Sequence, residues 1–300
     1  MVAGGGLLLG CGCVRRGRAT TDSGVRFTFG IVTDCHYAER DDPKGIRAYR
    51  ESTEKLAECV ADMNRQQADF LIELGDFKDQ GTDAAQTVEF LKTIEAVFER
   101  FEGPRYHVLG NHDMDRISKA QFLANIANAG FAKAQAYYSF DAGDIHFVVL
   151  DANCRQDGSD YDSGNFDWRQ AYVPAPQLAW LAADLAETRL PVIVFVHQRL
   201  DADQGKMYVR NAVEVRRVLE ASGRVRAVFQ GHHHVGGYRC VNGIHYYTLK
   251  ALVIGKGLGN SAYATVQVME DDSLNVIGFK HAESRLLARP GEEGIKRIRL

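Results

Sequence analysis

The chain has 300 residues, which is enough for one large domain or two small ones and for a sizeable buried core. Apolar residues make up 45% of the sequence and charged residues 25%, as in an ordinary soluble globular protein. The net charge of −3 argues against a general nucleic-acid-binding protein, because such proteins usually carry a basic surplus. We therefore expect no nucleic-acid partner.

The first 24 residues differ from the rest, and we treat 1–24 as a leader or signal-like segment. A small apolar run over 2–10 is too short to span a bilayer. The last residues of this run, together with Cys11, resemble a bacterial lipobox, which predicts a lipid anchor at Cys11. A secretory signal would also have a basic segment before the apolar run, and this chain has none there. Two alternatives stay open. One is an exported or lipid-anchored bacterial protein that starts further upstream, and the other is a cytoplasmic protein with a flexible leader.

After the leader, the pattern alternates between strands and helices. A β-rich run predicts a strand over 25–33, and apolar residues at helical spacing predict a helix over 46–67. Ser118 is expected to cap a later helix. The remaining elements of the first half are expected at 69–75 (strand), 83–101 (helix), 105–109 (strand), 118–128 (helix), 137–140 and 145–150 (a hairpin).

The second half begins with a polar loop over 152–174 and ends with strands only. Its expected elements are a helix at 176–187, a strand at 192–196, a helix at 209–219, a strand at 225–229 and further strands at 236–238, 244–249, 264–268 and 274–279. A chain in which strands first alternate with helices and then follow one another alone is typical of two packed sheets with helices outside. We predict one domain over 25–285 and a peripheral charged tail over 286–300.

Five short motifs place metal-binding side chains where strands are expected to end. They are Asp34-Cys35-His36, Gly75-Asp76-Phe77-Lys78-Asp79, Gly110-Asn111-His112-Asp113, Val196-His197-Gln198 and Gly231-His232-His233-His234. Carboxylate, imidazole and amide ligands without a thiolate suit manganese, iron, zinc or cobalt. Two such ions that share one carboxylate can hydrolyse phosphoesters.

The spacing within the motifs suggests how the ligands converge. Side chains two residues apart on extended backbone point the same way, so Asp34 and His36 are expected to form one chelating pair, and His232 and His234 another. A glycine precedes several of these residues, which allows close approach of the backbone.

In this order the motifs resemble the calcineurin-like metallophosphoesterases over residues 25–280. The resemblance implies an α/β fold, namely a four-layer α/β/β/α sandwich of two mixed β-sheets with a dinuclear metal site. It implies that one metal is held by Asp34, His36, Asp76 and His234. The second metal would be held by Asp76, Asn111, His197 and His232, so that Asp76 bridges the two ions.

The same resemblance implies roles for two further residues. His112 corresponds to the family histidine that stabilises the transition state or protonates the leaving oxygen, and Asp113 would orient His112. The reaction implied is in-line attack on phosphorus by a metal-activated hydroxide, without a covalent enzyme intermediate.

Within the family, residues 33–38 and 231–238 look most like the manganese-dependent ADP-ribose/CDP-alcohol diphosphatases. That likeness favours manganese, and it favours ADP-ribose or a CDP-alcohol as the small phosphorylated substrate. His36 is a departure, because eukaryotic members carry glutamine there. Asp79 stands where purple acid phosphatases have a tyrosine ligand, which argues against that branch. A phosphomonoesterase with the same metal site and a non-catalytic scaffold of the same fold are the alternatives.

Several other residues are expected to have structural roles. We expect free thiols at the four later cysteines, and no metal-binding or catalytic role for His107, His146, His233, His245 and His281. Asp79 either supports the metal ligands or caps its loop. The aromatic residues of the 152–174 loop either cover the substrate or pack the loop itself. The oligomeric state is not indicated by any motif.

Overall fold

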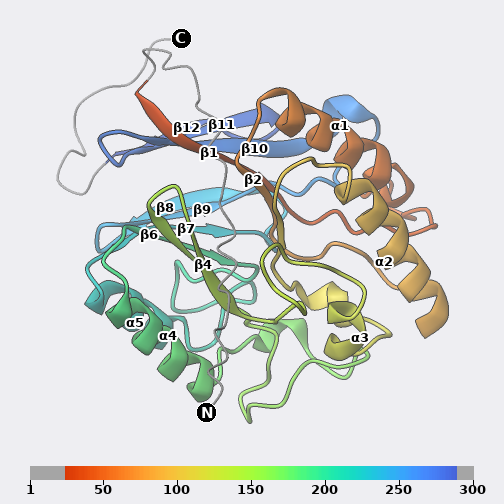
Figure 1. The fold of residues 1–300 in the computed structure, drawn as a ribbon. Helices are drawn as coiled ribbons and strands as arrows, with labels where there is room; N and C mark the ends of the chain where they lie inside the picture. The colour runs from red at the N-terminus through yellow and green to blue at the C-terminus, as the bar shows by residue number, and fades with distance from the viewer. Residues whose placement is uncertain (1–23, 289–300) are drawn as a thin grey trace, which may run out of the picture.

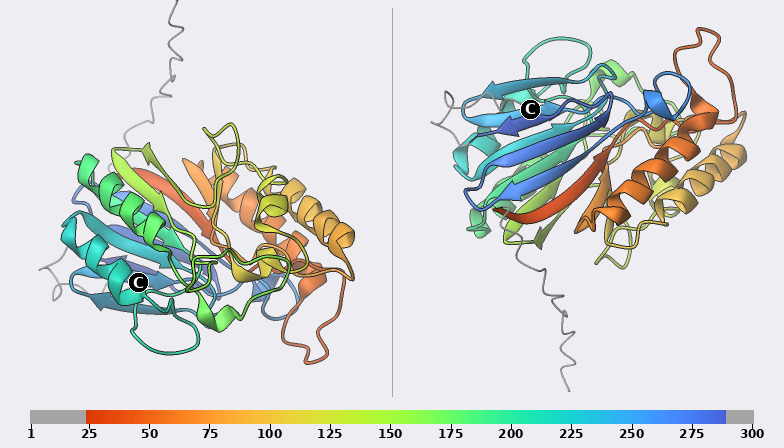
Figure 2. Two further views of the ribbon diagram at one scale, coloured as in Figure 1. Left: turned by 90° about the horizontal axis from the view of Figure 1, so that it is seen from below. Right: turned by 90° about the horizontal axis from the view of Figure 1, so that it is seen from above.

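The structure is a computed structural model that describes residues 24–288 (Figure 1). Two six-stranded sheets pack face to face, and helices cover their outer faces (Figure 1 and Figure 2). This arrangement confirms the predicted four-layer α/β/β/α sandwich of two mixed sheets. The expected lipid anchor at Cys11 lies outside the described residues. None of the helices in the described part of the chain is long and apolar enough to cross a membrane.

The first sheet combines a parallel half with an antiparallel half. Its strands lie in the order β12-β11-β10-β1-β2-β3, with β1–β2–β3 parallel and β10, β11 and β12 added antiparallel. The bounds are β1 Val25–Val32, β2 Phe70–Glu73, β3 Arg105–His107, β10 Ala262–Met269, β11 Leu274–Lys280 and β12 Arg285–Leu287.

The second sheet has a parallel centre and antiparallel edges. Its strands lie in the order β4-β5-β6-β7-β9-β8, with β5, β6, β7 and β9 parallel. The bounds are β4 Tyr138–Ala142, β5 Ile145–Val149, β6 Val192–Val196, β7 Val225–Gln230, β8 Gly237–Val241 and β9 Ile244–Thr248. The parallel strands of both sheets therefore deliver their carboxyl ends to one edge of the sandwich.

Five α-helices and four short 3₁₀ helices complete the described residues. The α-helices are α1 Ser52–Arg65, α2 Ala84–Phe98, α3 Lys119–Leu123, α4 Ala175–Glu187 and α5 Ala212–Ala221. The 3₁₀ helices are η1 Tyr49–Glu51, η2 Asn111–Met114, η3 Trp168–Gln170 and η4 Leu258–Asn260. The core on the outer face of the first sheet includes residues of α1 and α2, and that of the second sheet includes residues of α4 and α5 (Figure 2).

Side-chain caps begin two of the α-helices. Asp83 accepts the backbone N–H of Gln86 at 2.9 Å, and Ser118 accepts that of Gln121 at 3.1 Å. Each cap satisfies an amide that has no partner inside the helix. The cap expected at Ser118 is confirmed.

Two predicted helices are much shorter in the structure. The helix expected over 46–67 begins at Ser52, because Asp42 Oδ2 accepts the backbone N–H groups of Ile46 and Arg47 and so holds the chain in a loop there. The helix expected over 118–128 ends at Leu123, and the Asn128 side chain instead accepts the His107 backbone N–H at 2.8 Å. In both cases a polar side chain competes with helix continuation.

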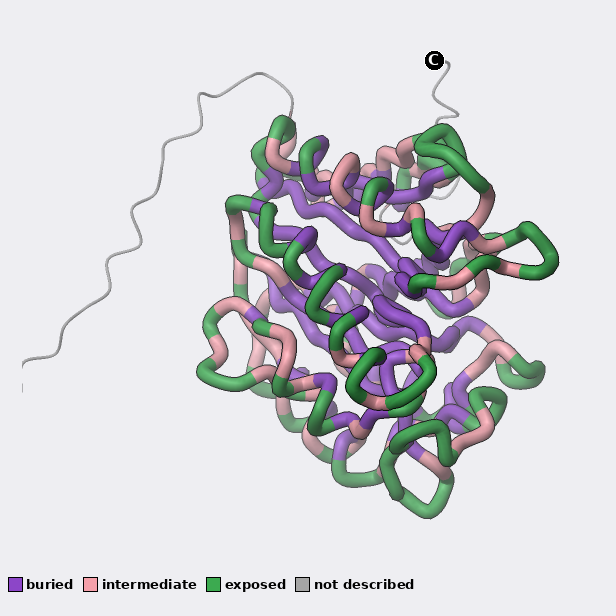
Figure 3. The backbone as a smooth tube through the Cα atoms, turned by 90° about the vertical axis from the view of Figure 1, so that its right-hand side faces the viewer, coloured by how far each residue is buried: buried purple, intermediate pink, exposed green. Residues whose placement is uncertain are grey.

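A layer of aromatic rings forms the core between the two sheets. Phe29 stacks on Phe70 with ring centroids 4.9 Å apart, and Phe29 meets Phe195 of the other sheet edge-on at 5.8 Å. Figure 3 shows the buried strands of both sheets together inside a shell of exposed loops and helix faces. This rigid interior fixes the strand ends that carry the candidate site.

The C-terminal boundary differs from the prediction. The tail was expected to begin at residue 286, but Arg285–Leu287 form β12, which pairs with β11, and the Leu287 side chain is buried. The two leucines supply an apolar edge strand inside a charged stretch, which masks the strand pattern. The sheet therefore extends beyond the predicted boundary at residue 285.

Candidate metal centre

The predicted ligands gather at the edge where the parallel strands of both sheets end. Asp34 and His36 follow β1, Asp76 follows β2 and Asn111 follows β3. The second sheet supplies His197 after β6, and His232 and His234 after β7. Residues separated by as many as 200 positions thus meet because two sheets present their carboxyl ends to one place.

The first group of ligand atoms surrounds Asp34 Oδ1. This oxygen lies 3.2 Å from His234 Nε2 and 3.6 Å from His36 Nε2, and the two Nε2 atoms lie 3.2 Å from each other. Two imidazole nitrogens that approach so closely repel unless a proton or a cation lies between them. Together the three side chains form a compact set of one oxygen and two nitrogen donors.

The second group surrounds Asp76 Oδ2. His197 Nε2 lies 3.1 Å from this oxygen, and the ring centroids of His197 and His232 are 5.1 Å apart. His36 of the first group lies 3.5 Å from the same Asp76 oxygen, so Asp76 stands between the two groups. The structure thus places the one carboxylate expected to bridge where it can reach both.

Unpartnered polar atoms show that these residues fit cations. Asp34 Oδ1, Asn111 Oδ1, His197 Nε2 and His232 Nε2 are buried and make no hydrogen bond to any described residue. A buried polar atom without a partner costs about 1–3 kcal/mol, so four of them in one place are unusual. Oxygen and imidazole nitrogen atoms of this kind are the donors that divalent manganese, iron and zinc accept.

The backbone at the site is held in a rarely populated conformation. Asp34, His36, Asp76 and His232 all have positive φ, between 48° and 66°. The expectation that Asp34 and His36 share a face of extended backbone is therefore wrong, although the two side chains do converge. His232 and His234 diverge, one to each group. Strained backbone of this kind persists at functional sites because the surrounding structure enforces it.

Close backbone approach explains two of the motif glycines. A Cβ atom on Gly110 would lie 2.0 Å from the Asp76 nitrogen, and one on Gly75 would lie 2.6 Å from the Gly110 nitrogen. The loops that follow β2 and β3 therefore pack backbone against backbone, as the sequence predicted. The His112 N–H donates to Asp76 Oδ1 at 2.7 Å, so residues on both sides of Asn111 contact Asp76.

His112 is oriented by Asp115, which corrects the expectation for Asp113. Asp115 Oδ2 lies 2.7 Å from His112 Nδ1. Asp113 instead accepts four backbone N–H groups, from Gly110 at 2.8 Å, Phe77 at 2.9 Å, Asp76 at 3.1 Å and Lys78 at 3.4 Å. Asp113 therefore shapes the loop that carries Asp76. Asp115 is a member of no recognised motif, and only its position three residues after His112 could have indicated its role.

Comparison with known proteins places this arrangement in a family. The family model for calcineurin-like phosphoesterases matches residues 27–236. The chain belongs to the calcineurin-like phosphoesterase family. As a member, it is a metal-dependent hydrolase of phosphoric esters.

Relatives of this phosphoesterase share most of its length. It is 27% identical over 306 residues to the manganese-dependent ADP-ribose/CDP-alcohol diphosphatase of Oryza sativa subsp. japonica, covering 88% of this chain and 95% of that protein. The Arabidopsis thaliana protein of the same name is 25% identical over 309 residues, covering 86% and 96%. A dimetal phosphatase from Danio rerio has the same fold, with a TM-score of 0.74 and 22% identity over 88% of this chain and 99% of that chain.

The electrostatics of the phosphoesterase site keep the carboxylates ionised and divide the histidines. Neighbouring carboxylates outweigh burial at two of them, because Asp76 raises the pKa of His197 to about 10, and Asp34 and Asp79 raise the pKa of His36. Burial disfavours ionisation of Asp76, but the charges of His197, His112 and His36 outweigh it and hold the pKa of the Asp76 carboxyl well below its usual range. Burial, with the neighbouring His197, lowers the pKa of His232 to about 3. A neutral imidazole next to a carboxylate can give its lone pair to a cation.

The pKa of His112, which is not one of the expected ligands, is raised like those of His197 and His36. Burial opposes its charge, but Asp76, Asp115 and Asp79 outweigh that effect and raise the pKa of the His112 imidazole to about 9. A raised pKa keeps this ring protonated at neutral pH, which suits a group that stabilises or protonates an oxygen anion. The bond to Asp115 engages Nδ1 and leaves Nε2 available.

Asp79 supports a ligand. Its Oδ2 lies 3.4 Å from His36 Nδ1, and its Oδ1 pairs with Arg40 at 2.8 Å and accepts the Gln80 N–H at 2.7 Å. Both alternatives left open by the sequence therefore apply, because the carboxylate holds the imidazole of His36 while it also caps its own loop. Sequence reasoning missed Arg40, because an arginine in a polar loop carries no spacing signal.

The histidines expected to be structural lie apart from these two groups. His107 is held between Glu73 and Glu95, at 3.0 and 3.2 Å, and His146 contacts Asp141 and Asp184. His233 meets Arg199, His245 meets Tyr238, and His281 meets Asn260. Cys35, Cys59 and Cys154 are free and buried, as expected.

The aromatic side chains of the 152–174 loop fall into two sets, of which one packs the loop as expected, while a role in covering the substrate stays a prediction. Tyr161 is buried and stacks on Phe166 with centroids 4.3 Å apart, so these rings pack the loop. Trp168 instead stays exposed, and its ring meets that of His232 edge-on at 5.5 Å. One aromatic side chain of the loop therefore borders the metal centre.

Proposed function

We propose that the protein is a dinuclear manganese-dependent phosphohydrolase that cleaves the pyrophosphate linkage of small nucleotide conjugates such as ADP-ribose or CDP-alcohols. The observation that carries this proposal is the position of Asp76 between two groups of donor side chains, each of which includes buried polar atoms without a hydrogen bond. One carboxylate that reaches two donor sets is what a two-metal hydrolase requires.

The proposed ligand set follows these two groups. Asp34, His36 and His234 would hold one ion, Asn111, His197 and His232 would hold the other, and Asp76 would contact both. Two divalent ions bound there supply electrostatic stabilisation of the phosphoryl charge and a water of lowered pKa as nucleophile. The chain itself contributes the geometry, because rigid strand ends fix the ligands from both sheets.

His112 is proposed to act on the phosphoryl oxygens or on the leaving oxygen. Asp115 holds the imidazole at Nδ1, so its proton stays on that nitrogen when Nε2 gives its own proton to the leaving oxygen. Asp79 and Arg40 form the layer behind His36, and Asp113 fixes the loop of Asp76. These supporting contacts keep the ligands from rotating.

Two observations favour a nucleotide conjugate as the substrate. The curated relatives that match over most of this chain are named for ADP-ribose and CDP-alcohols. Trp168 offers an exposed ring beside His232, and such a ring can stack on a nucleobase. His36 is compatible with manganese, because imidazole and carboxylate together form a ligand set that manganese accepts.

A product-resolved assay tests the proposal. Protein stripped of metal and then loaded with Mn²⁺ is given ADP-ribose, CDP-choline, bis-p-nitrophenyl phosphate and p-nitrophenyl phosphate in parallel. We expect AMP and ribose 5-phosphate from ADP-ribose, no turnover in the stripped control and two Mn²⁺ per chain by elemental analysis. Turnover of the monoester alone would place the protein among the phosphomonoesterases instead.

A further inference from the structure

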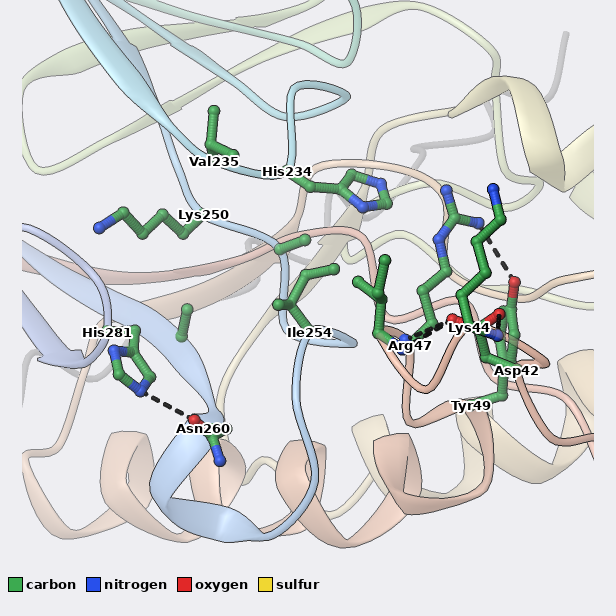
Figure 4. A pocket seen from close by; sticks show the side chains of 13 residues that line it. Asp42, Lys44, Arg47, Tyr49, His234, Val235, Lys250, Ile254, Asn260 and His281 are labelled. Carbon is green, nitrogen blue, oxygen red and sulfur yellow. Dashed lines mark hydrogen bonds between the residues drawn. The ribbon is translucent and has the colours of Figure 1, made fainter.

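A pocket of about 800 Å³ opens directly beside the metal centre (Figure 4). His234 forms part of its wall, so the pocket is continuous with the first group of ligand atoms. The opposite walls come from the loop between β1 and η1 and from residues 250–262. Its volume is in the usual range for a small-molecule site and is far larger than one phosphoryl group needs.

Cationic side chains dominate the charge of this pocket. Lys44, Arg47 and Lys250 line it, against the single carboxylate of Asp42. Asp42 is already engaged, because its oxygens accept the backbone N–H groups of Lys44 at 3.1 Å, and of Ile46 and Arg47 at 2.9 Å each. The pocket therefore presents a net positive wall beside a site that handles phosphate.

The three cationic side chains differ in the partners that they already contact. Arg47 Nη1 donates to the Tyr49 hydroxyl at 3.3 Å and lies 3.9 Å from Asp79 Oδ2, while Lys250 pairs with Glu283 at 3.2 Å. Lys44 is exposed. Figure 4 shows Lys44 and Arg47 on one side of His234 and Lys250 on the other. An anion that enters from the metal centre would therefore meet positive charge on two walls.

Apolar side chains share the same walls. Ile46 is 53% exposed and Val235 is 66% exposed, and both line the pocket with Ile254. Five large hydrophobic residues are exposed in the described part of the chain, and Ile46 and Val235 are the two most exposed of them. Exposed apolar surface next to cations is typical of a groove that takes an organic anion.

We propose that this pocket binds the second phosphoryl group of the substrate, with its attached organic moiety, while the first phosphoryl group occupies the metal centre. This inference rests on the proposed function and adds to it the residues that select a pyrophosphate over a simple ester, namely Arg47 and Lys44. Hydrolysis of such an anhydride consumes one water and breaks one P–O bond to give two phosphomonoesters. The leaving group of the reaction is the phosphomonoester that the cationic walls of the pocket hold.

Charge-removing variants test the inference. Arg47→Gln and Lys44→Gln are compared with Arg100→Gln and Lys92→Gln, which remove the same charges from the exposed surface of α2 and the turn after it. Each Mn²⁺-loaded protein is assayed on ADP-ribose and on bis-p-nitrophenyl phosphate, which has no second phosphoryl group. We expect kcat/KM for ADP-ribose to fall about 10–100-fold in the pocket variants, as for the loss of a charge-assisted hydrogen bond. Activity on the diester should change by less than about threefold.

A binding measurement gives a second readout that needs no turnover. Calorimetric titration with α,β-methylene-ADP and with AMP measures how much affinity the second phosphoryl group adds. We expect native protein and both controls to prefer the diphosphate, and Arg47→Gln and Lys44→Gln to lose most of that preference. Melting temperatures within about 2 °C of native protein would show that the variants fold.

The outcomes separate this inference from the proposed function. If native protein cleaves neither substrate, the proposed function fails, and the preference for the diphosphate still decides the role of the pocket. If the variants slow both substrates equally, Arg47 acts on the metal centre through Asp79 and the inference is wrong. It is wrong as well if the variants keep full activity on ADP-ribose and full preference for the diphosphate.

Discussion

The floor and the rim of the active site are built in different ways. The floor consists of the seven predicted metal ligands, and six of them are at most 6% exposed. The rim consists of exposed loop residues, of which Ile46 is 53%, Trp168 38% and Val235 66% exposed. The floor is anchored to strand ends and restricted to a few donor types, whereas the rim only needs to match a substrate. The chemistry of the reaction therefore depends on the floor, and the choice of substrate depends on the rim.

The largest effect is expected from Asp76→Asn in the floor. The amide keeps the shape of the side chain but removes the charge that stands between the two groups of donor atoms. We expect activity on every substrate to fall to the level of the metal-free control, and elemental analysis to find fewer than two Mn²⁺ per chain. A variant that retained both ions and native turnover would show that Asp76 does not bridge.

His112→Ala should separate catalysis from metal binding within the same floor. His112 contacts Asp115 through Nδ1 and leaves Nε2 available for the substrate. We expect kcat to fall about 10²–10⁴-fold, the usual effect of losing acid–base help, with Mn²⁺ content unchanged. A loss of metal together with activity would instead identify His112 as a ligand.

The convergence of the floor residues could be predicted from the sequence, whereas the only part of the rim that the sequence indicated was the aromatic 152–174 loop. Asp34, Asp76 and His232 are recognisable because metal chemistry permits few residue types and because each lies in a short motif after a buried strand. The motifs do not encode which side chain supports which ligand. His112 was therefore assigned to the adjacent Asp113, although the turn of η2 directs its ring to Asp115.

The contacts of the rim escaped prediction for a related reason. Trp168 reaches His232 only because the 152–174 loop lies next to the loop that follows β7, and the pocket beside His234 forms from segments about 200 residues apart. No local pattern reports such a juxtaposition. The shortened helix at Ser52 matters here too, because Ile46 and Arg47, which were expected to be helical, line the pocket instead.

Asp115→Asn and Asp113→Asn should distinguish support of a catalytic group from support of a loop. Within the described chain, the carboxylate of Asp115 makes one hydrogen bond, which is to the His112 ring. The Asp115→Asn variant should therefore lower kcat about 10–100-fold with little change in melting temperature. Asp113 accepts four backbone N–H groups, so its amide variant should lower the free energy of unfolding by about 1–3 kcal/mol. Chemical denaturation and steady-state kinetics on both variants measure the two effects. The reverse pattern would restore Asp113 as the residue that orients His112.

The smallest effect is expected at the rim, from Trp168→Ala. The exposed ring beside His232 can contact a nucleobase but no metal-bound phosphoryl group, so its removal should raise KM for ADP-ribose about fivefold, which corresponds to roughly 1 kcal/mol of stacking. Hydrolysis of p-nitrophenyl phosphate, which has no nucleobase, should keep its native KM and kcat. Trp168→Phe retains an aromatic face and should restore most of the affinity. If Trp168→Ala lowered kcat on both substrates alike, the ring would act by holding His232 in place. Trp168 would then belong to the floor and not to the rim.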